Sequence, residues 1–128
     1  MLKNANEKRD LYFLFFTNLV YLLGCLLVFN LYEYKLNPDG TSYISIAQKY
    51  ASGNFDEAIN AYWGPLYSWL IAFLVRLRID PLIGAKVVSI LSGSLALMAI
   101  QRLAKDLKLD NISRYVLIVT SITLILSF

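Results

Sequence analysis

The sequence predicts an all-α membrane protein in which several helices cross the bilayer. Hydrophobic residues make up 58% of the 128 residues and charged residues only 16%, which is more apolar than a soluble domain of this length. The apolar residues also come in long uncharged blocks, which the core of a small soluble fold could not bury. We therefore expect one membrane domain over residues 1–128, a multi-pass protein of the cell membrane, the plasma or inner membrane.

The first predicted span covers residues 11–32. The preceding ten residues are polar and include Lys3, Lys8 and Arg9, whereas residues 11–32 contain no charge. A helix of this length reaches across the hydrocarbon core, and it is too long for the apolar part of a cleaved signal peptide. Basic residues next to a span favour the cytoplasmic side, so the amino terminus is expected in the cytoplasm.

The most polar stretch of the chain is the loop over residues 33–65, which this orientation places outside. Asn37-Pro38-Asp39-Gly40 predicts a turn, because proline fixes φ and Asp and Gly suit tight geometry. The apolar residues that follow keep helical spacing from Ser42 to Ala51, and Gly53 stands just past their end. We expect a short helix there, lying on the membrane surface.

A second short helix is predicted after Asn54. Asp56 and Glu57 fall in its first turn, where the helix dipole favours acids, and Phe55, Ile59 and Tyr62 share one face. Gly64-Pro65 is expected to end it. The loop is thus predicted to consist of short interfacial helices.

Three further spans are predicted over residues 66–79, 82–101 and 115–128, the last of them incomplete, so that the chain looks truncated. If every span crosses, the polar connector over residues 102–114 lies outside, although it carries four basic residues: Arg102, Lys105, Lys108 and Arg114. That conflicts with the usual cytoplasmic excess of basic residues. A short segment that does not cross is the other reading, and simple alternation is the one we keep here.

Several kinds of chemistry are excluded by composition. The chain has no histidine and one cysteine, Cys25, so it offers no His-based acid and base catalysis, no Cys-His nucleophile and no zinc site built from several Cys or His ligands. The net charge of +3 is small, and the basic residues stand mainly beside apolar blocks. No nucleic-acid partner is expected.

The segment "PDGTSYISIAQKYASGNFDEAINAYWGPLYSWLIAFLVRL" resembles the first external loop and second span of GT-C glycosyltransferases. It is most similar in pattern to bacterial family 39 proteins related to dolichyl-phosphate-mannose protein mannosyltransferases. The matching positions, in order, are Asp39, Tyr43, Ala47, Gly53, Trp63, Pro65, Leu66 and Tyr67. The resemblance covers roughly residues 8–128 and is most specific from Asp39 to Trp69. Many members of the wider family carry an Asp-Glu pair where this chain has Asp39-Gly40, which puts a two-carboxylate arrangement in doubt.

This resemblance implies the amino-terminal part of an enzyme that transfers a sugar from a polyprenyl-phosphate donor to an acceptor on the external face. Asp39 would be the catalytic carboxylate, either accepting the proton of the acceptor hydroxyl or holding a divalent cation. The substrate-binding residues would be Tyr43, Tyr62, Trp63 and Tyr67. The remaining transmembrane helices of a full-length protein would complete the site.

Simpler readings of the same residues stay open. Local sequence alone favours Asp39 as a turn former, and an interfacial aromatic belt explains Tyr62, Trp63 and Tyr67 without a substrate. The whole chain also fits a non-catalytic multi-pass scaffold or subunit whose small residues in 82–101 pack against a partner. We expect the 128-residue chain alone to lack transferase activity, because the loop offers a carrier phosphate only Lys35 and Lys49.

Overall fold

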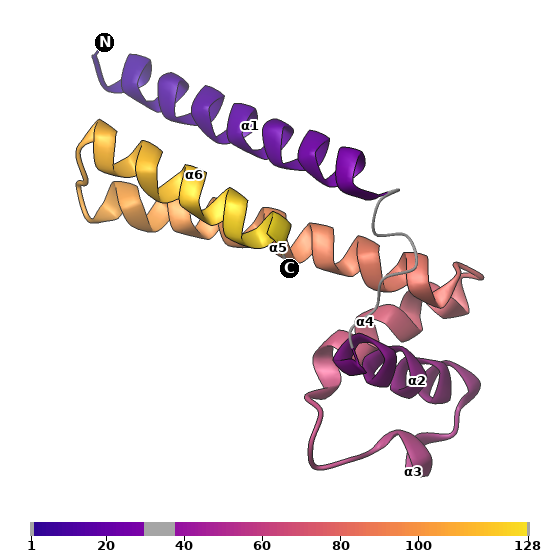
Figure 1. Cartoon of the computed structure of the whole chain (residues 1–128). Helices are drawn as coiled ribbons and strands as arrows, with labels where there is room; N and C mark the ends of the chain where they lie inside the picture. The colour runs from indigo at the N-terminus through magenta and orange to yellow at the C-terminus, as the bar shows by residue number, and fades with distance from the viewer. Residues whose placement is uncertain (1, 30–37, 128) are drawn as a thin grey trace. The chain divides into compact units, whose positions relative to one another are not determined.

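The computed structural model describes residues 2–29 and 38–127, with side chains described for 8–29 and 38–123. Within these ranges the regular structure is entirely helical (Figure 1). The helices are α1 (Leu2–Phe29), α2 (Pro38–Ser52), α3 (Phe55–Ala58), α4 (Pro65–Arg76), α5 (Pro81–Asp106) and α6 (Asn111–Ser127). The all-α prediction is confirmed for this part of the chain. The contacts divide the protein into two compact units, residues 1–33 with 92–128 and residues 34–91, so that α5 contributes to both.

Two helices, α1 and α5, are long and apolar enough to cross a membrane, judged by length and composition. The qualifying segments are Lys8–Phe29, with 22 residues, and Pro81–Asp106, with 26 residues. They correspond to the predicted spans 11–32 and 82–101, although residues 30–32 lie outside the described part. The finding suggests membrane association. The number of crossings and their orientation stay predictions.

In the first unit α1 and the second half of α5 run antiparallel. Asp10, near the start of α1, forms an ion pair of 3.0 Å with Lys105, near the end of α5. Further along α1, Asn18 accepts a hydrogen bond of 2.7 Å from Ser94, which lies eleven residues before Lys105. α6 lies against α1, and the rings of Phe13 and Tyr115 meet edge to face at 5.1 Å.

A buried polar contact joins α1 and α5 inside this unit. Gln101 Nε2 donates a hydrogen bond to Thr17 Oγ1, and both residues are buried. Thr17 Oγ1 in turn donates to the carbonyl oxygens of Phe13 and Leu14. Polar side chains that bond across apolar helices stabilise their association, so these residues fix the register of α1 against α5.

Replacing Gln101 with leucine is expected to lower the stability of the protein in detergent by about 1 kcal/mol, the usual size of a hydrogen bond between apolar helices. Thr17→Val tests the partner. The loss of unfolding free energy in the double variant is expected to be smaller than the sum of the two single losses by roughly 0.6 kcal/mol, measured by denaturant titration. Thr123→Val is the matched control, because Thr123 donates only to carbonyls of its own helix. Strict additivity of Gln101→Leu and Thr17→Val would contradict the contact.

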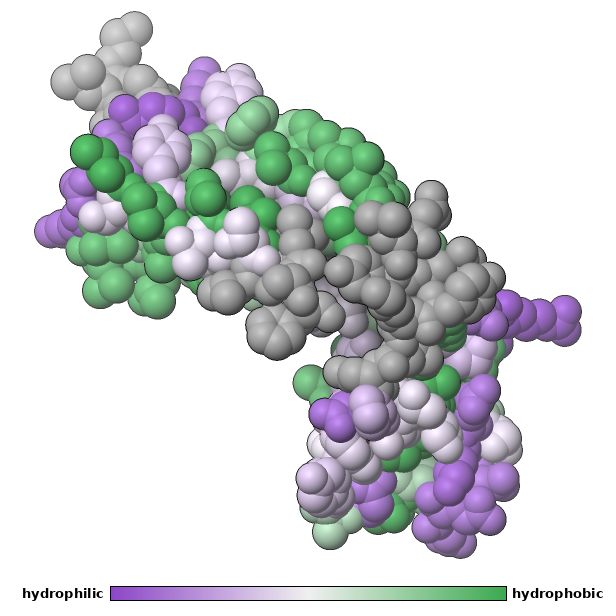
Figure 2. Space-filling view, viewed as in Figure 1, coloured by the Kyte–Doolittle hydropathy of each residue, from purple (hydrophilic) through white to green (hydrophobic). Residues whose placement is uncertain are grey.

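Large apolar side chains cover much of the outside of the first unit. On α1 the most exposed include Leu11, Tyr12, Phe15, Phe16, Leu26 and Leu27. Figure 2 shows hydrophobic residues over the visible face of α1 and α6, and hydrophilic residues gathered at the end where α1 begins. So much exposed apolar surface is unusual for a soluble protein and suits lipid as the surroundings.

In the second unit α2 and α4 lie side by side and run parallel. Ser68 Oγ, at the start of α4, donates to the carbonyl of Tyr43 at 3.1 Å. At the other end, Arg76 donates to the carbonyls of Tyr50, at 3.2 Å, and Ala51, at 3.4 Å. The core between them holds Ile46, Ala47, Tyr50, Ile71 and Ala72, together with Ala85 and Val88 of α5.

Helix α4 is shorter than the predicted span 66–79. Its 12 residues extend for about 18 Å, whereas the hydrocarbon core is about 30 Å thick. The prediction also separated Arg76 from the loop by a membrane, yet Arg76 caps the carboxyl end of α2, inside that loop. A crossing at this segment therefore stays a prediction, without support from these contacts.

The predicted turn before α2 is wrong for residues 38–40, which form the first turn of the helix. Pro38 suits this position because its φ is already helical and its missing N–H is not needed there. Asp39 stands in the first turn, where the helix dipole favours an acid. Gly40 therefore acts as a helical residue and needs no special turn geometry. Asn37 lies outside the described residues.

The second short helix in the loop is also shorter than predicted. α3 covers only Phe55–Ala58, and the residues from Ile59 to Gly64 form an irregular segment. Asn54 occupies the predicted cap position but makes no capping hydrogen bond with its side chain. The segment is held differently, because Asn60 Oδ1 accepts hydrogen bonds from the backbone of Tyr62 at 3.1 Å and Trp63 at 2.7 Å.

The polar connector predicted over 102–114 is mostly helical. α5 continues to Asp106, and α6 begins at Asn111. Lys108 adopts a φ of 54°, and the N–H of Leu109 bonds back to the carbonyl of Ala104 at 3.1 Å, which closes the helix tightly. Asp110 then caps α6 by accepting from the N–H groups of Ile112 and Ser113. The side-chain hydrogen bond from Ser113, aided by the backbone donors, holds the pKa of Asp110 below its usual value.

Candidate functional site

The second unit brings together aromatic residues that the sequence analysis singled out. The ring of Tyr43, on α2, meets the rings of Trp63 at 5.0 Å and Tyr67 at 5.1 Å, both edge to face. Trp63 also meets Tyr62, at 4.8 Å. Edge-to-face pairs of this kind contribute about 0.5–1.5 kcal/mol each beyond their buried area. We call Tyr43, Tyr62, Trp63 and Tyr67 the aromatic cluster.

Hydrogen bonds fix the position of this cluster. The hydroxyl of Tyr67 donates to the carbonyl of Ala85 at 3.0 Å and lies 2.8 Å from Ser89 Oγ, which ties α4 to the start of α5. Ser68, fully buried, ties α4 to α2 through the carbonyl of Tyr43. Tyr67 is therefore held by contacts with α5, and Tyr43 by the hydrogen bond from Ser68 of α4. Asn60 holds the segment that carries Trp63.

The members of the cluster differ in exposure. Tyr62 is 84% exposed, whereas Tyr43, Trp63 and Tyr67 are half-buried, and Trp63 and Tyr67 pack against the core of the unit. The inner rings therefore form a rigid base, and Tyr62 presents most of its ring to the surroundings. A rigid aromatic surface with one exposed ring suits contact with a flat, amphipathic group such as a sugar.

Asp39 lies four residues before Tyr43 on α2, so the two residues share one helix face. Its carboxylate is exposed, and within the described residues it forms no hydrogen bond or ion pair. It is thus unengaged in this part of the chain, as a proton acceptor must be before substrate arrives. Its place in the first turn also gives it a structural role, because it complements the helix dipole.

Asp56 and Glu57 are two further acids of the loop, and Glu57 is engaged in an ion pair. Both stand in the first turn of α3. Glu57 forms an ion pair of 3.9 Å with Lys49, whose Nζ also donates to the Glu57 carbonyl at 3.2 Å. The pair joins α2 to α3. Lys49 is therefore partly committed to holding the loop together.

The described residues contain no group of three or more His, Cys, Asp or Glu side chains that could hold a metal ion. In this part of the protein Asp39 would supply a single carboxylate to a divalent cation. Further ligands would have to come from outside this part of the chain. A role as proton acceptor needs only the one carboxylate.

Sequence reasoning missed the residues that support the cluster. Asn60, Ser68 and Ser89 act through hydrogen bonds that depend on how α2, α4 and α5 pack. Only Asn60 had a local signal, since Asn side chains often bond the backbone two or three residues on. Ser68 and Ser89 looked like ordinary small polar residues in apolar helices.

No protein-family model, curated protein or solved structure matches this chain.

Proposed function

We propose that this chain is the amino-terminal part of a GT-C-type membrane glycosyltransferase, similar to family 39 mannosyltransferases. The observation that carries the proposal is the meeting of Tyr43, Trp63 and Tyr67 one helical turn from Asp39. Tyr43 is distant in sequence from Trp63 and Tyr67, and all three are matching positions of the resemblance. An aromatic surface beside an unengaged carboxylate suits sugar transfer.

In the proposed reaction the aromatic cluster binds the sugar and the first part of the polyprenyl-phosphate donor. The oxygen of the acceptor hydroxyl forms a bond with the anomeric carbon of the donor sugar, and Asp39 accepts the proton that this hydroxyl loses. The bond from that carbon to the phosphate oxygen breaks, and polyprenyl phosphate leaves with the electron pair. Its negative charge needs cationic or amide donors. Lys49 and Arg76 bond to backbone carbonyls, so other parts of a complete protein would supply these donors.

We further propose that α1 and α5 cross the membrane and that α4 does not. The ion pairs of Asp10 with Lys105 and with Arg114, at 3.0 and 3.5 Å, bring the turn between α5 and α6 to the start of α1. The basic residues of 102–114 then share the cytoplasmic side with Lys8 and Arg9, as the distribution of basic residues favours. With both of these ends in the cytoplasm, the residues between α1 and α5 lie on the external side. They include Asp39 and the aromatic cluster.

The contacts of α5 weaken one argument for the scaffold. The scaffold reading needs the small residues of α5 for a partner chain. Ser89 contacts Tyr67, Ser94 bonds to Asn18, and Gly93 is buried within the chain. Part of the small-residue surface is therefore occupied inside the protein.

Donor binding to the cluster tests the proposal. In a Trp69→Phe background, Trp63 is the remaining tryptophan, because the chain has two. Adding polyprenyl-phosphate mannose in detergent is expected to change its fluorescence with saturation, and polyprenol of the same length is expected to bind on the order of tenfold more weakly. Tyr62→Ala should weaken donor binding about tenfold, which corresponds to about 1.4 kcal/mol. Phe55→Ala, an exposed aromatic of α3 outside the cluster, is the matched control. Equal binding of the donor and polyprenol would contradict a sugar-phosphate site.

A further inference from the structure

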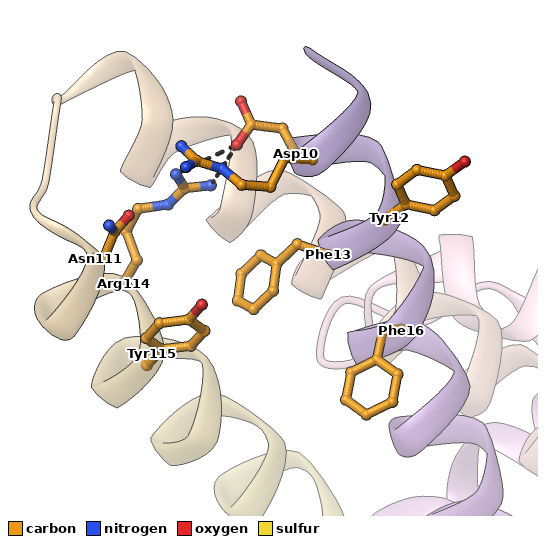
Figure 3. Close-up of a pocket in the computed structure, with 8 residues that line it drawn as sticks. Asp10, Tyr12, Phe13, Phe16, Asn111, Arg114 and Tyr115 are labelled. Carbon is orange, nitrogen blue, oxygen red and sulfur yellow. Dashed lines mark hydrogen bonds and ion pairs between the residues drawn. The ribbon is translucent and has the colours of Figure 1, made fainter. Parts of the chain in front are cut away.

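A cavity of about 300 Å³ lies in the first unit, between the start of α1 and the start of α6 (Figure 3). Its lining combines two arginines, Arg9 and Arg114, with Asp10, Asn111 and four aromatic side chains. Figure 3 shows Arg114 reaching from α6 toward Asp10 on α1, above the rings of Phe13 and Tyr115. The cavity belongs to neither the aromatic cluster nor Asp39.

Positive charge exceeds negative charge around this cavity. The carboxylate of Asp10 is shared by two cations, Lys105 at 3.0 Å and Arg114 at 3.5 Å. Arg9 is exposed at the lining and forms no ion pair within the described residues. The lining thus holds two arginines and one carboxylate, and Lys105 pairs with that same carboxylate. An anion would complete the balance.

Arg114 has a hydrogen-bond donor left over. Its Nη1 and Nη2 point to Asp10 Oδ1, both at the long distance of 3.5 Å, and its Nε is buried without a partner among the described residues. The guanidinium also lies 5.8 Å from the centre of the Phe13 ring, which holds it in place. A buried N–H group without an acceptor is rare in proteins. A guanidinium whose Nη groups are held only by such long hydrogen bonds suits a phosphate oxygen.

The other wall of the cavity is apolar and open. Tyr12, Phe16 and Tyr115 are each more than half exposed, and the uncharged part of α1 begins at Leu11, directly after Asp10. In a membrane this boundary falls at the level of the lipid headgroups. A ligand here would have cations around one end and aromatic rings along the other. An anionic lipid fits these surroundings, because it has an anionic headgroup and an apolar tail.

We infer that this cavity binds the phosphate of an anionic phospholipid, with Arg114 and Arg9 as its cationic ligands, Asn111 as an amide donor and the acyl chains along Phe16 and Tyr115. Basic pockets between membrane helices bind such headgroups elsewhere. The bound lipid would join α1 to α6 at a point where Asp10 alone leaves excess positive charge. The site stands independently of the proposed sugar transfer.

Lipid binding to the purified chain tests this inference. Native mass spectrometry would count bound phosphatidylglycerol and phosphatidylcholine with the same acyl chains. We expect a preference for phosphatidylglycerol, and a loss of about five- to tenfold in its affinity for each of Arg114→Gln and Arg9→Gln. Lys108→Gln is the matched control, because Lys108 is exposed in the neighbouring turn and does not line the cavity. It should change the affinity less than about twofold.

Three outcomes would overturn the inference. Equal losses in Arg114→Gln, Arg9→Gln and Lys108→Gln would indicate diffuse surface charge in place of a site. Unchanged affinity in Arg9→Gln, whose side chain makes no ion pair with the described residues that folding could need, would remove the cavity from lipid binding. Inorganic phosphate that displaces the lipid at similar concentration would identify a site for a soluble anion.

Discussion

If the chain is part of the proposed transferase, replacing Asp39 with asparagine in the complete enzyme is expected to lower the rate of sugar transfer on the order of 10²–10⁴-fold, the usual contribution of a general base. The amide keeps the size of the carboxylate but cannot accept the proton. Because Asp39 is exposed and forms no hydrogen bond or ion pair within the described residues, its replacement should leave expression and membrane insertion unchanged. The rate would be measured as release of polyprenyl phosphate from a polyprenyl-phosphate-sugar donor.

The same substitution separates catalysis from helix stabilisation. If Asp39 only complements the dipole of α2, Asp39→Asn should cost at most about 1 kcal/mol of local stability and change turnover by no more than a few-fold. Asp56→Asn is the matched control, since Asp56 is also an exposed acid in the first turn of a helix. Large and equal losses at both positions would mean that the two acids act together. No loss at either would remove the loop from the chemistry.

The sequence predicted the helical content because long apolar blocks and helical spacing are local signals. α1 and α5 follow from long apolar runs, and the end of α2 before Gly53 follows from glycine's tolerance of its φ of 86°. The start of α2 was misplaced, because Pro-Asp-Gly suits both a turn and the first turn of a helix. Local sequence alone does not distinguish the two.

Contacts between helices could not be predicted from spacing. Arg76 read as a charge at the end of a span, but its guanidinium caps the carboxyl end of α2. Arg114 and Lys105 read as part of a polar connector, but they pair with Asp10, about a hundred residues earlier. Such pairs depend on the path of the whole chain. For the candidate site, the sequence identified the aromatic residues and missed the side chains that hold them.

The central claim is that α1 and α5 cross the membrane while Asp39 and the aromatic cluster lie outside. Two turns distinguish it from simple alternation of all predicted spans. Arg78 follows α4 and Lys108 follows α5, and both side chains are exposed. Two crossings place Arg78 outside and Lys108 in the cytoplasm, whereas alternation places each on the opposite side.

The most direct test is labelling of single cysteines with an impermeant thiol reagent in a Cys25→Ser background. Asn54→Cys, external in both arrangements, is the positive control. The proposed topology predicts that Arg78→Cys reacts in intact cells as readily as Asn54→Cys, and that Lys108→Cys reacts only after lysis. Labelling of Lys108→Cys in intact cells, with Arg78→Cys protected until lysis, would contradict it.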